Sequence, residues 1–195
     1  MTGFYACTES EAKPEEAADE KMEMTEEEMV ERGQYLVGIL DCNVCHTPKV
    51  MTDQGPGFDT ERLLSGHPGD RPIEAGTVPM EPEAWQTGQW IVAAGDFTAY
   101  AGAWGISFAA NLTPHETGLA NWTVENFKRS IKHGEFKGME GGRKLLPPMP
   151  WQAYSALPDE DLEAIWAYLQ TIPAVDNRVP NPVPPAGPPP SEPAS

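Results

Sequence analysis

The sequence predicts an all-α fold around a single hydrophobic core. Three segments carry apolar side chains at the spacing of one helix face, and each has its own start or stop signals. A chain of 195 residues is long enough for one such core with tails on either side. It has no run of about eighteen apolar residues, so no membrane-spanning helix is expected.

The first helix is expected to begin after Thr25 and to lead into the cysteine motif at residues 42–46. Thr25 and Glu28 have the spacing of a capping box, which satisfies backbone donors at a helix start. Apolar or small residues then recur at helical spacing: Met29, Gly33, Leu36, Val37 and Leu40. We therefore expect the motif to close this helix.

A second helix is expected within "NWTVENFKRSIKHG". Thr123 can cap it, Trp122 and Phe127 are spaced as a hydrophobic staple, and Gly134 can end it. The side chains predicted to be buried are Val124, Phe127 and Ile131.

The third helix is expected within "PDEDLEAIWAYLQTIP". Its first turn is acidic, which the helix dipole favours, and Pro173 stops it. The predicted apolar face contains Leu162, Ile165, Trp166 and Leu169.

The remaining segments lack helical periodicity. Residues 47–110 form a long insertion rich in glycine, proline and tryptophan, in which "QWIVAAGDFTAY" predicts a short β-hairpin around residues 95–96. Residues 1–24 read as an acidic, disordered tether, and residues 174–195 as a solvated, proline-rich tail or a docking peptide. One domain is thus expected over residues 25–173.

The formal net charge of −17 makes nonspecific binding to nucleic acid or to an anionic membrane surface unfavourable. Residues 1–31 hold 11 acidic residues and two lysines, so about half of this charge lies at the start of the chain. A neutral or cationic partner is easier to accommodate.

The stretch "DCNVCHTP" carries the chemistry. A thioredoxin-like dithiol needs its two cysteines at the start of a helix, whereas this motif is expected to end one. A structural zinc site needs further ligands, and His67, His115 and His133 are scattered along the chain. Covalent haem attachment explains Cys42, Cys45 and His46 together, as two thioether anchors and an iron ligand.

A haem iron held by one histidine has a second axial position. Met149 is the preferred candidate because "LLPPMPW" brackets it with prolines, which hold a loop stiff. The alternatives are Met139 between glycines, Met51 or Met80 in the insertion, and the three other histidines. A thioether ligand would raise the reduction potential relative to a second histidine.

The order of four motifs resembles the class I c-type cytochromes, close to the cytochrome domains that serve periplasmic dehydrogenases. The motifs are the helix into "CNVCH", "FAANLTPHETGLANWT", "LLPPMPW" and "DEDLEAIWAYLQTIP". The resemblance covers roughly residues 29–173 and implies at least three helices around one covalent haem c. It implies thioether bonds at Cys42 and Cys45, iron ligation by His46 and Met149, and a helix crossing near Gly33 and Trp166.

Further haem contacts are expected from four side chains. Arg143 or Lys144 can bind a haem propionate, although the basic run around them also fits a solvated helix face. Asn111 is expected at the haem. Trp104 is expected there too, either in a lid with Trp85 and Trp90 or on a surface that docks a partner subunit. The His46 ring N–H is expected to donate to a backbone carbonyl, with Pro48 or Pro56 as its source.

With both axial positions filled, the expected function is one-electron transfer between redox protein partners in a respiratory chain, without catalysis. A fixed cytochrome subunit of a membrane respiratory assembly, of the alternative complex III type or a dehydrogenase, is the second reading. A haem enzyme or gas sensor, which needs an open iron site, is the third. The haem motif implies a location in the periplasm or at the outer face of the cytoplasmic membrane. Cys7 is either a lipid-anchored lipoprotein cysteine or an incidental thiol.

Overall fold

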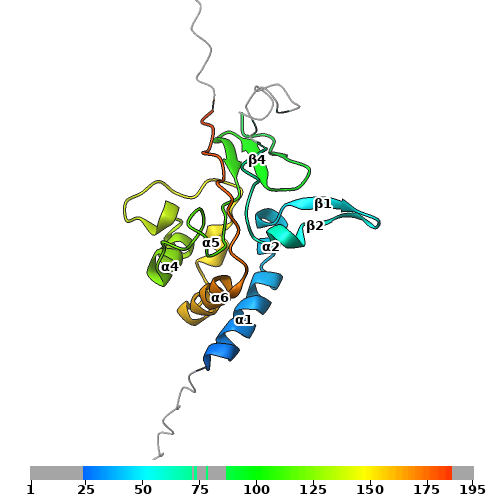
Figure 1. Ribbon diagram of the computed structural model, residues 1–195. Coiled ribbons are helices and arrows are strands. Elements are labelled where there is room, and N and C mark those ends of the chain that lie inside the picture. The colour runs from blue at the N-terminus through cyan, green and yellow to red at the C-terminus, as the bar shows by residue number, and fades with distance from the viewer. Residues whose placement is uncertain (1–23, 72, 74–77, 79–86, 186–195) are drawn as a thin grey trace, which may run out of the picture.

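Figure 1 shows the computed structural model, which describes residues 24–71, 73, 78 and 87–185. The expectations for residues 1–23 with Cys7, for Met80 and Trp85, and for residues 186–195 lie outside these ranges. Within the described ranges, no helix combines the length and the apolar character that spanning a membrane requires.

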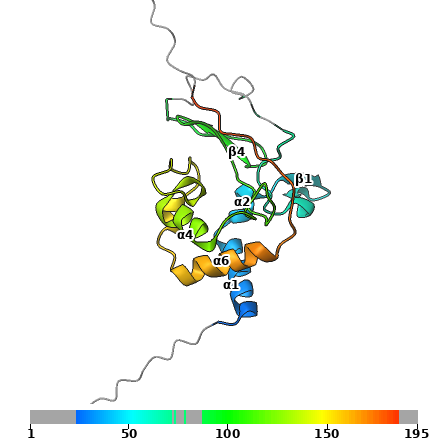
Figure 2. The same cartoon turned by 60° about the vertical axis from the view of Figure 1, so that its left-hand side comes forward.

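Two long helices cross at the base of the fold (Figures 1 and 2). They are α1, Glu26–Ile39, and α6, Asp159–Thr171. The predicted capping box is present, since the Thr25 hydroxyl accepts from the Glu28 N–H at 3.2 Å. Gly33 lies against α6 so closely that a Cβ there would be 2.0 Å from the Ala164 carbonyl oxygen. The contact on α6 is Ala164 and Tyr168, one turn of helix that brackets the expected Trp166.

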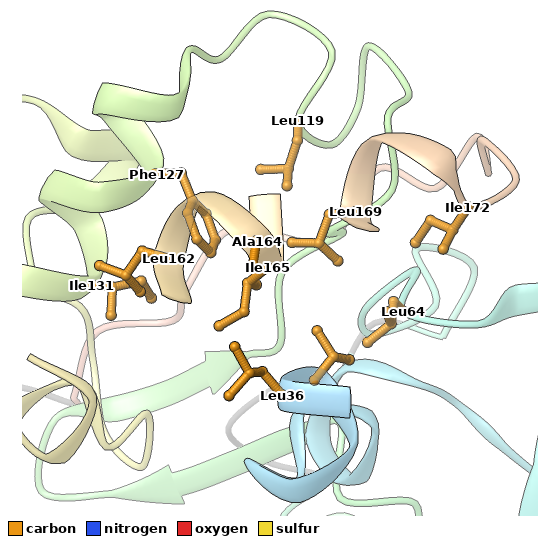
Figure 3. Packing of buried hydrophobic residues seen from close by; sticks show 11 residues of the cluster. Leu36, Leu64, Leu119, Phe127, Ile131, Leu162, Ala164, Ile165, Leu169 and Ile172 are labelled. Carbon is orange, nitrogen blue, oxygen red and sulfur yellow. The ribbon is translucent and has the colours of Figure 1, made fainter. Parts of the chain in front are cut away.

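The helix α4, Val124–His133, packs on the other side of α6. Thr123 caps it and Gly134 ends it with a φ of 63°, as the sequence predicted. The Phe127 and Trp166 rings meet with their centroids 5.8 Å apart. Figure 3 shows the core that these helices enclose. Its buried members are Leu36, Val37, Leu64, Leu119, Phe127, Ile131, Leu162, Ala164, Ile165, Leu169 and Ile172.

The cysteine motif forms a short helix of its own, α2, Cys42–His46. Asp41 adopts a left-handed conformation with a φ of 57°, which interrupts the helical geometry between α1 and α2. The expectation that the motif closes the first helix is therefore wrong. Short helical segments elsewhere are η1, Thr60–Arg62, η3, Phe136–Gly138, and α5, Trp151–Tyr154.

The described part of the insertion contains two small antiparallel sheets, so the fold is not all-α. One is the hairpin of β1, Lys49–Thr52, and β2, Gly55–Phe58. The other has the order β3, Val92–Ala93, β4, Ala99–Gly102, and β5, Gly105–Phe108. The expected hairpin corresponds to β3 and β4. Strands β2, "GPGF", and β5, "GISF", contain glycine or proline, residues with weak strand preference, so their composition does not predict strands.

The described part of the tail packs on the insertion and is not solvated throughout. Val183 and Ile106 exchange backbone hydrogen bonds of 3.0 and 2.8 Å, which extends the sheet beyond β5. A Cβ on Gly105 would lie 2.0 Å from the Val183 carbonyl oxygen. The tail therefore returns across the fold, from the end of α6 to the sheet of β3, β4 and β5 (Figure 2).

The helix crossing yields a prediction with a matched control. Gly33→Ala should lower the free energy of unfolding by about 3 kcal/mol, because its Cβ would overlap the Ala164 backbone. Gly38→Ala on the same helix should be neutral or stabilising by up to about 1 kcal/mol, since nothing lies within 4 Å of its Cβ. Chemical denaturation of both variants measures the difference. Equal effects would contradict this packing.

Candidate haem-binding site

The helix α2 presents its two cysteines and its histidine together. Cys42 and Cys45 are one helical turn apart, so their side chains leave the helix on the same side, and His46 follows directly. Both thiols are free and half-buried. The arrangement offers two thiol groups and one imidazole to a ligand that lies along one face of α2.

The imidazole of His46 is fixed by the insertion. Its Nδ1 lies 2.8 Å from the Ala110 carbonyl oxygen. A carbonyl only accepts, so Nδ1 carries the proton and Nε2 is left with a free lone pair. Desolvation lowers the pKa of His46, which favours the neutral ring that binds metals. The predicted carbonyl partner is thus present, but its source is Ala110; Pro48 instead accepts from the Asp59 N–H.

The Cys42 thiol lacks the lowered pKa that activates a redox dithiol. The motif does open a helix, contrary to the expectation used against a thioredoxin-like site. Burial nevertheless raises the pKa of the Cys42 thiol to about 11, whereas a reactive dithiol needs a lowered value. The Cys45 sulfur lies 3.2 Å from the Tyr100 hydroxyl of β4. A raised pKa at Cys42 therefore does not favour a redox dithiol.

Met149 approaches the same apolar region from the end of the domain. It is half-buried and packs against the core cluster that Cys42 also contacts. Its loop is pinned to β5, because the Ser107 hydroxyl donates to the Pro147 carbonyl at 2.6 Å. The Trp104 ring N–H in turn donates to Ser107 at 3.1 Å. Trp104 therefore supports the Met149 loop through Ser107, a residue that sequence reasoning missed.

The alternative axial ligands are less well placed. Met51 and Met139 are 79% and 62% exposed. Both ring nitrogens of His67 are engaged, by the Thr98 hydroxyl and by the Arg71 carbonyl, each at 2.7 Å. In the described parts of the chain, no three His, Cys, Asp or Glu side chains gather as a metal site.

Asn111 has a different environment from the one expected. Its side chain is buried, and its amide N–H₂ donates to the Val175 carbonyl at 2.9 Å and to Thr117 at 3.1 Å. Its carbonyl oxygen accepts from the Thr113 N–H at 2.9 Å. Asn111 thus links a loop to the tail and has its amide occupied by protein groups. Trp90 is 62% exposed, and a lid formed by it stays a prediction.

The first three cations of the basic run after residue 127 form ion pairs: Lys128, Arg129 and Lys132. Lys128 lies within 3.2 Å of Glu125, Asp159 and Glu163, which raise the pKa of its ammonium group. Arg129 pairs with Glu135 at 3.2 Å. These contacts favour the solvated helix face over a surface that steers an acidic partner.

Arg143 and Lys144 both stabilise the loop that leads to Met149. Arg143 lies over the Phe136 ring at 3.6 Å, and the Lys144 ammonium donates to the His133 carbonyl at 2.7 Å. Both side chains are exposed. Propionate binding by either remains a prediction.

Lys49 is a functional candidate that sequence reasoning missed. Its ammonium group donates to the carbonyls of Val44 and Thr47, at the end of α2. It also lies over the rings of Phe58 and Phe97, at 5.3 and 5.8 Å from their centroids. Its charge contributes to lowering the pKa of His46. No local signal indicates this role, because the two rings come from separate strands and turns of the insertion.

The donor set fits haem c. Two free thiols at one-turn spacing can form the two thioether bonds, and a neutral imidazole with a free Nε2 can bind the iron. Cys42 and Met149 pack on the same apolar core cluster as other half-buried apolar side chains, among them Leu40, Leu63, Leu112, Tyr154 and Leu157, and such a surface is suited to a porphyrin.

Comparisons with known proteins agree with this chemistry. No family model matches the chain. It is 28% identical over 143 residues to the fructose dehydrogenase cytochrome subunit of Gluconobacter japonicus, covering 73% of the chain and 21% of that protein. It is 27% identical over 142 residues to the gluconate 2-dehydrogenase cytochrome c subunit of Pantoea cypripedii, covering 72% of the chain and 22% of that protein.

A third relative is the cytochrome c subunit of the quinone-dependent alcohol dehydrogenase of Gluconobacter oxydans, 24% identical over 145 residues, 74% of the chain and 21% of that protein. The chain thus spans about a fifth of the length of these relatives. The predicted resemblance is confirmed: the chain resembles the c-type cytochromes that form subunits of dehydrogenases.

Proposed function

We propose that the protein is a single-haem c-type cytochrome that transfers one electron at a time between redox protein partners. The observation that carries this proposal is His46, directly behind two free thiols, with Nδ1 bonded to Ala110 and Nε2 free. The similarity to cytochrome c subunits over about three quarters of the chain supports it. We place the protein in the periplasm or at the outer face of the membrane.

Each site residue has a stated role in this proposal. Cys42 and Cys45 anchor the haem, His46 binds one face of the iron, and Met149 binds the other. The haem supplies one-electron chemistry, and its potential depends on the axial ligands, their hydrogen bonds and the local charge. With both faces closed by side chains, substrate has no access to the metal, and the protein acts as a carrier.

A fixed subunit of a dehydrogenase or of a larger respiratory assembly is the second candidate. The relatives are named as subunits, which favours an assembly over a free carrier. Exposed apolar side chains near α2 also favour it, since Val44, Phe58 and Phe97 are 37%, 44% and 47% exposed. Lipid attachment at Cys7 remains a prediction for either case.

Covalent attachment is tested by the cysteines. Protein made in a host that matures c-type cytochromes should give a pyridine haemochrome spectrum and retain haem after denaturation. The double variant Cys42→Ser, Cys45→Ser should release its haem into acidified organic solvent or contain none, because serine forms no thioether. Haem-free wild-type protein would contradict the proposed function.

Met149→Ala tests the second axial ligand. We expect loss of the methionine-to-iron absorption band, a lower reduction potential and rapid binding of carbon monoxide by the reduced protein, since the thioether stabilises ferrous iron. Met139→Ala is the matched control, because Met139 is 62% exposed. If Met149→Ala leaves spectrum and potential unchanged, another residue binds the iron. Rapid carbon monoxide binding by the wild type would favour the gas-sensor reading.

Lys49→Gln tests the charge held at the end of α2. A fixed cation near the iron disfavours the ferric state, so its removal should lower the reduction potential. Lys137→Gln is the control, because the Lys137 ammonium lies over the Phe136 ring at 5.6 Å but on η3, away from α2. Redox titration compares the three proteins. Equal shifts in both variants would assign the effect to net charge alone.

A further inference from the structure

Asn177, in the tail beyond α6, holds together two loops that are far apart in sequence. Its side-chain N–H₂ donates to the carbonyls of Ser65 and His67, at 2.6 and 2.9 Å. Its side-chain oxygen accepts from the Gly69 N–H at 2.8 Å. Its backbone N–H donates to the Thr117 hydroxyl at 3.1 Å. One residue thus joins the loop around residues 65–69 to the loop around residues 111–117.

A residue of the first loop, Gly66, and the residue just before the second loop, Ala110, both contact His46. The Gly66 N–H donates to the His46 carbonyl at 2.8 Å, and the Ala110 carbonyl accepts from the His46 ring at 2.8 Å. The two segments are also bonded to each other, since the His67 N–H donates to Ala109 and the Leu112 N–H to Leu64, each at 2.9 Å. His46 is therefore held at its backbone carbonyl and at its ring by two segments, residues 64–67 and 109–112, that are hydrogen-bonded to each other. We call these two segments the paired unit.

The two segments of the paired unit are packed so closely that neither can shift without losing the hydrogen bonds between them. Gly66 has a φ of 79°, and a Cβ there would lie 2.5 Å from the Ala109 carbonyl oxygen. Ser65 and His67 are buried, so their carbonyls have little access to water if Asn177 is removed. Asn111 adds a second link to the tail, because its side chain donates to the Val175 carbonyl at 2.9 Å.

We infer that Asn177 is a positioning residue for the haem-binding histidine. By clamping residues 65–69 and 111–117, it keeps the Ala110 carbonyl in hydrogen-bonding position on the His46 ring. A strong bond at Nδ1 makes the ring a better donor to iron through Nε2, which stabilises the ferric state and lowers the reduction potential. The tail thus sets the potential through the proximal ligand. This inference rests on the proposed haem function.

The direction in which the reduction potential shifts when Asn177 is replaced distinguishes a positioning role from a loss of structure. Weakening the hydrogen bond from the His46 ring to the Ala110 carbonyl should raise the reduction potential, because the ring becomes a poorer electron donor to the iron. Opening the site to water should instead lower it, because water stabilises the more highly charged ferric iron. Positioning and simple exposure therefore predict opposite signs.

The test uses the full-length holoprotein with Asn177→Ala and Asn177→Asp. The aspartate keeps an oxygen for the Gly69 N–H but cannot donate to Ser65 and His67. Asn126→Ala is the control, because the Asn126 side chain caps α4, accepting from the Thr123 N–H at 3.1 Å without contacting these loops. Redox titration gives the potential, and nuclear magnetic resonance gives the hydrogen exchange rate of the His46 ring N–H.

We expect both Asn177 variants to raise the potential and to speed exchange of the His46 ring proton, while Asn126→Ala changes neither. An unchanged potential, a lowered potential or an unchanged exchange rate in the Asn177 variants would overturn the inference. A pyridine haemochrome assay on every protein keeps the two proposals apart. If the wild type carries no haem, the proposed function fails, while the exchange rate still shows whether Asn177 positions His46.

Discussion

The bond from the His46 ring to the Ala110 carbonyl is the contact on which the candidate site depends. It fixes which ring nitrogen carries the proton, and thereby leaves Nε2 free as a metal ligand. It also ties the short helix α2 to the end of the insertion, 64 residues along the chain. The Gly66 N–H, which donates to the His46 carbonyl, and the contact of Cys45 with Tyr100 also attach α2 to the insertion. The insertion is thus part of the site's support.

The elements with local signals could be predicted from the sequence. The caps at Thr25 and Thr123 and the glycine end of α4 depend on neighbouring residues, and the structure shows all three. Cys42, Cys45 and His46 are likewise recognisable because their chemistry depends on spacing alone. The break at Asp41 was missed because a non-glycine residue with positive φ leaves no clear sequence pattern.

The parts that could not be predicted depend on contacts between distant segments. Ala110 has no distinctive side chain, and its role comes from where its carbonyl lies. Asn177 lies in a segment whose proline content suggested a solvated tail, yet its amide bonds to buried backbone groups. Lys49 gains its position from two aromatic rings of the insertion. Composition describes average behaviour, and single buried hydrogen bonds override it.

The insertion supports both proposed axial ligands from one sheet. Its last strand, β5, holds the Met149 loop through Ser107 and Pro147, and the chain leaving β5 supplies the carbonyl for His46. The tail adds a backbone pair to the same strand at Ile106. A haem iron bound between His46 and Met149 would therefore be held on both faces by ligands that share a scaffold. Movement of β5 would therefore shift the supports of both proposed ligands.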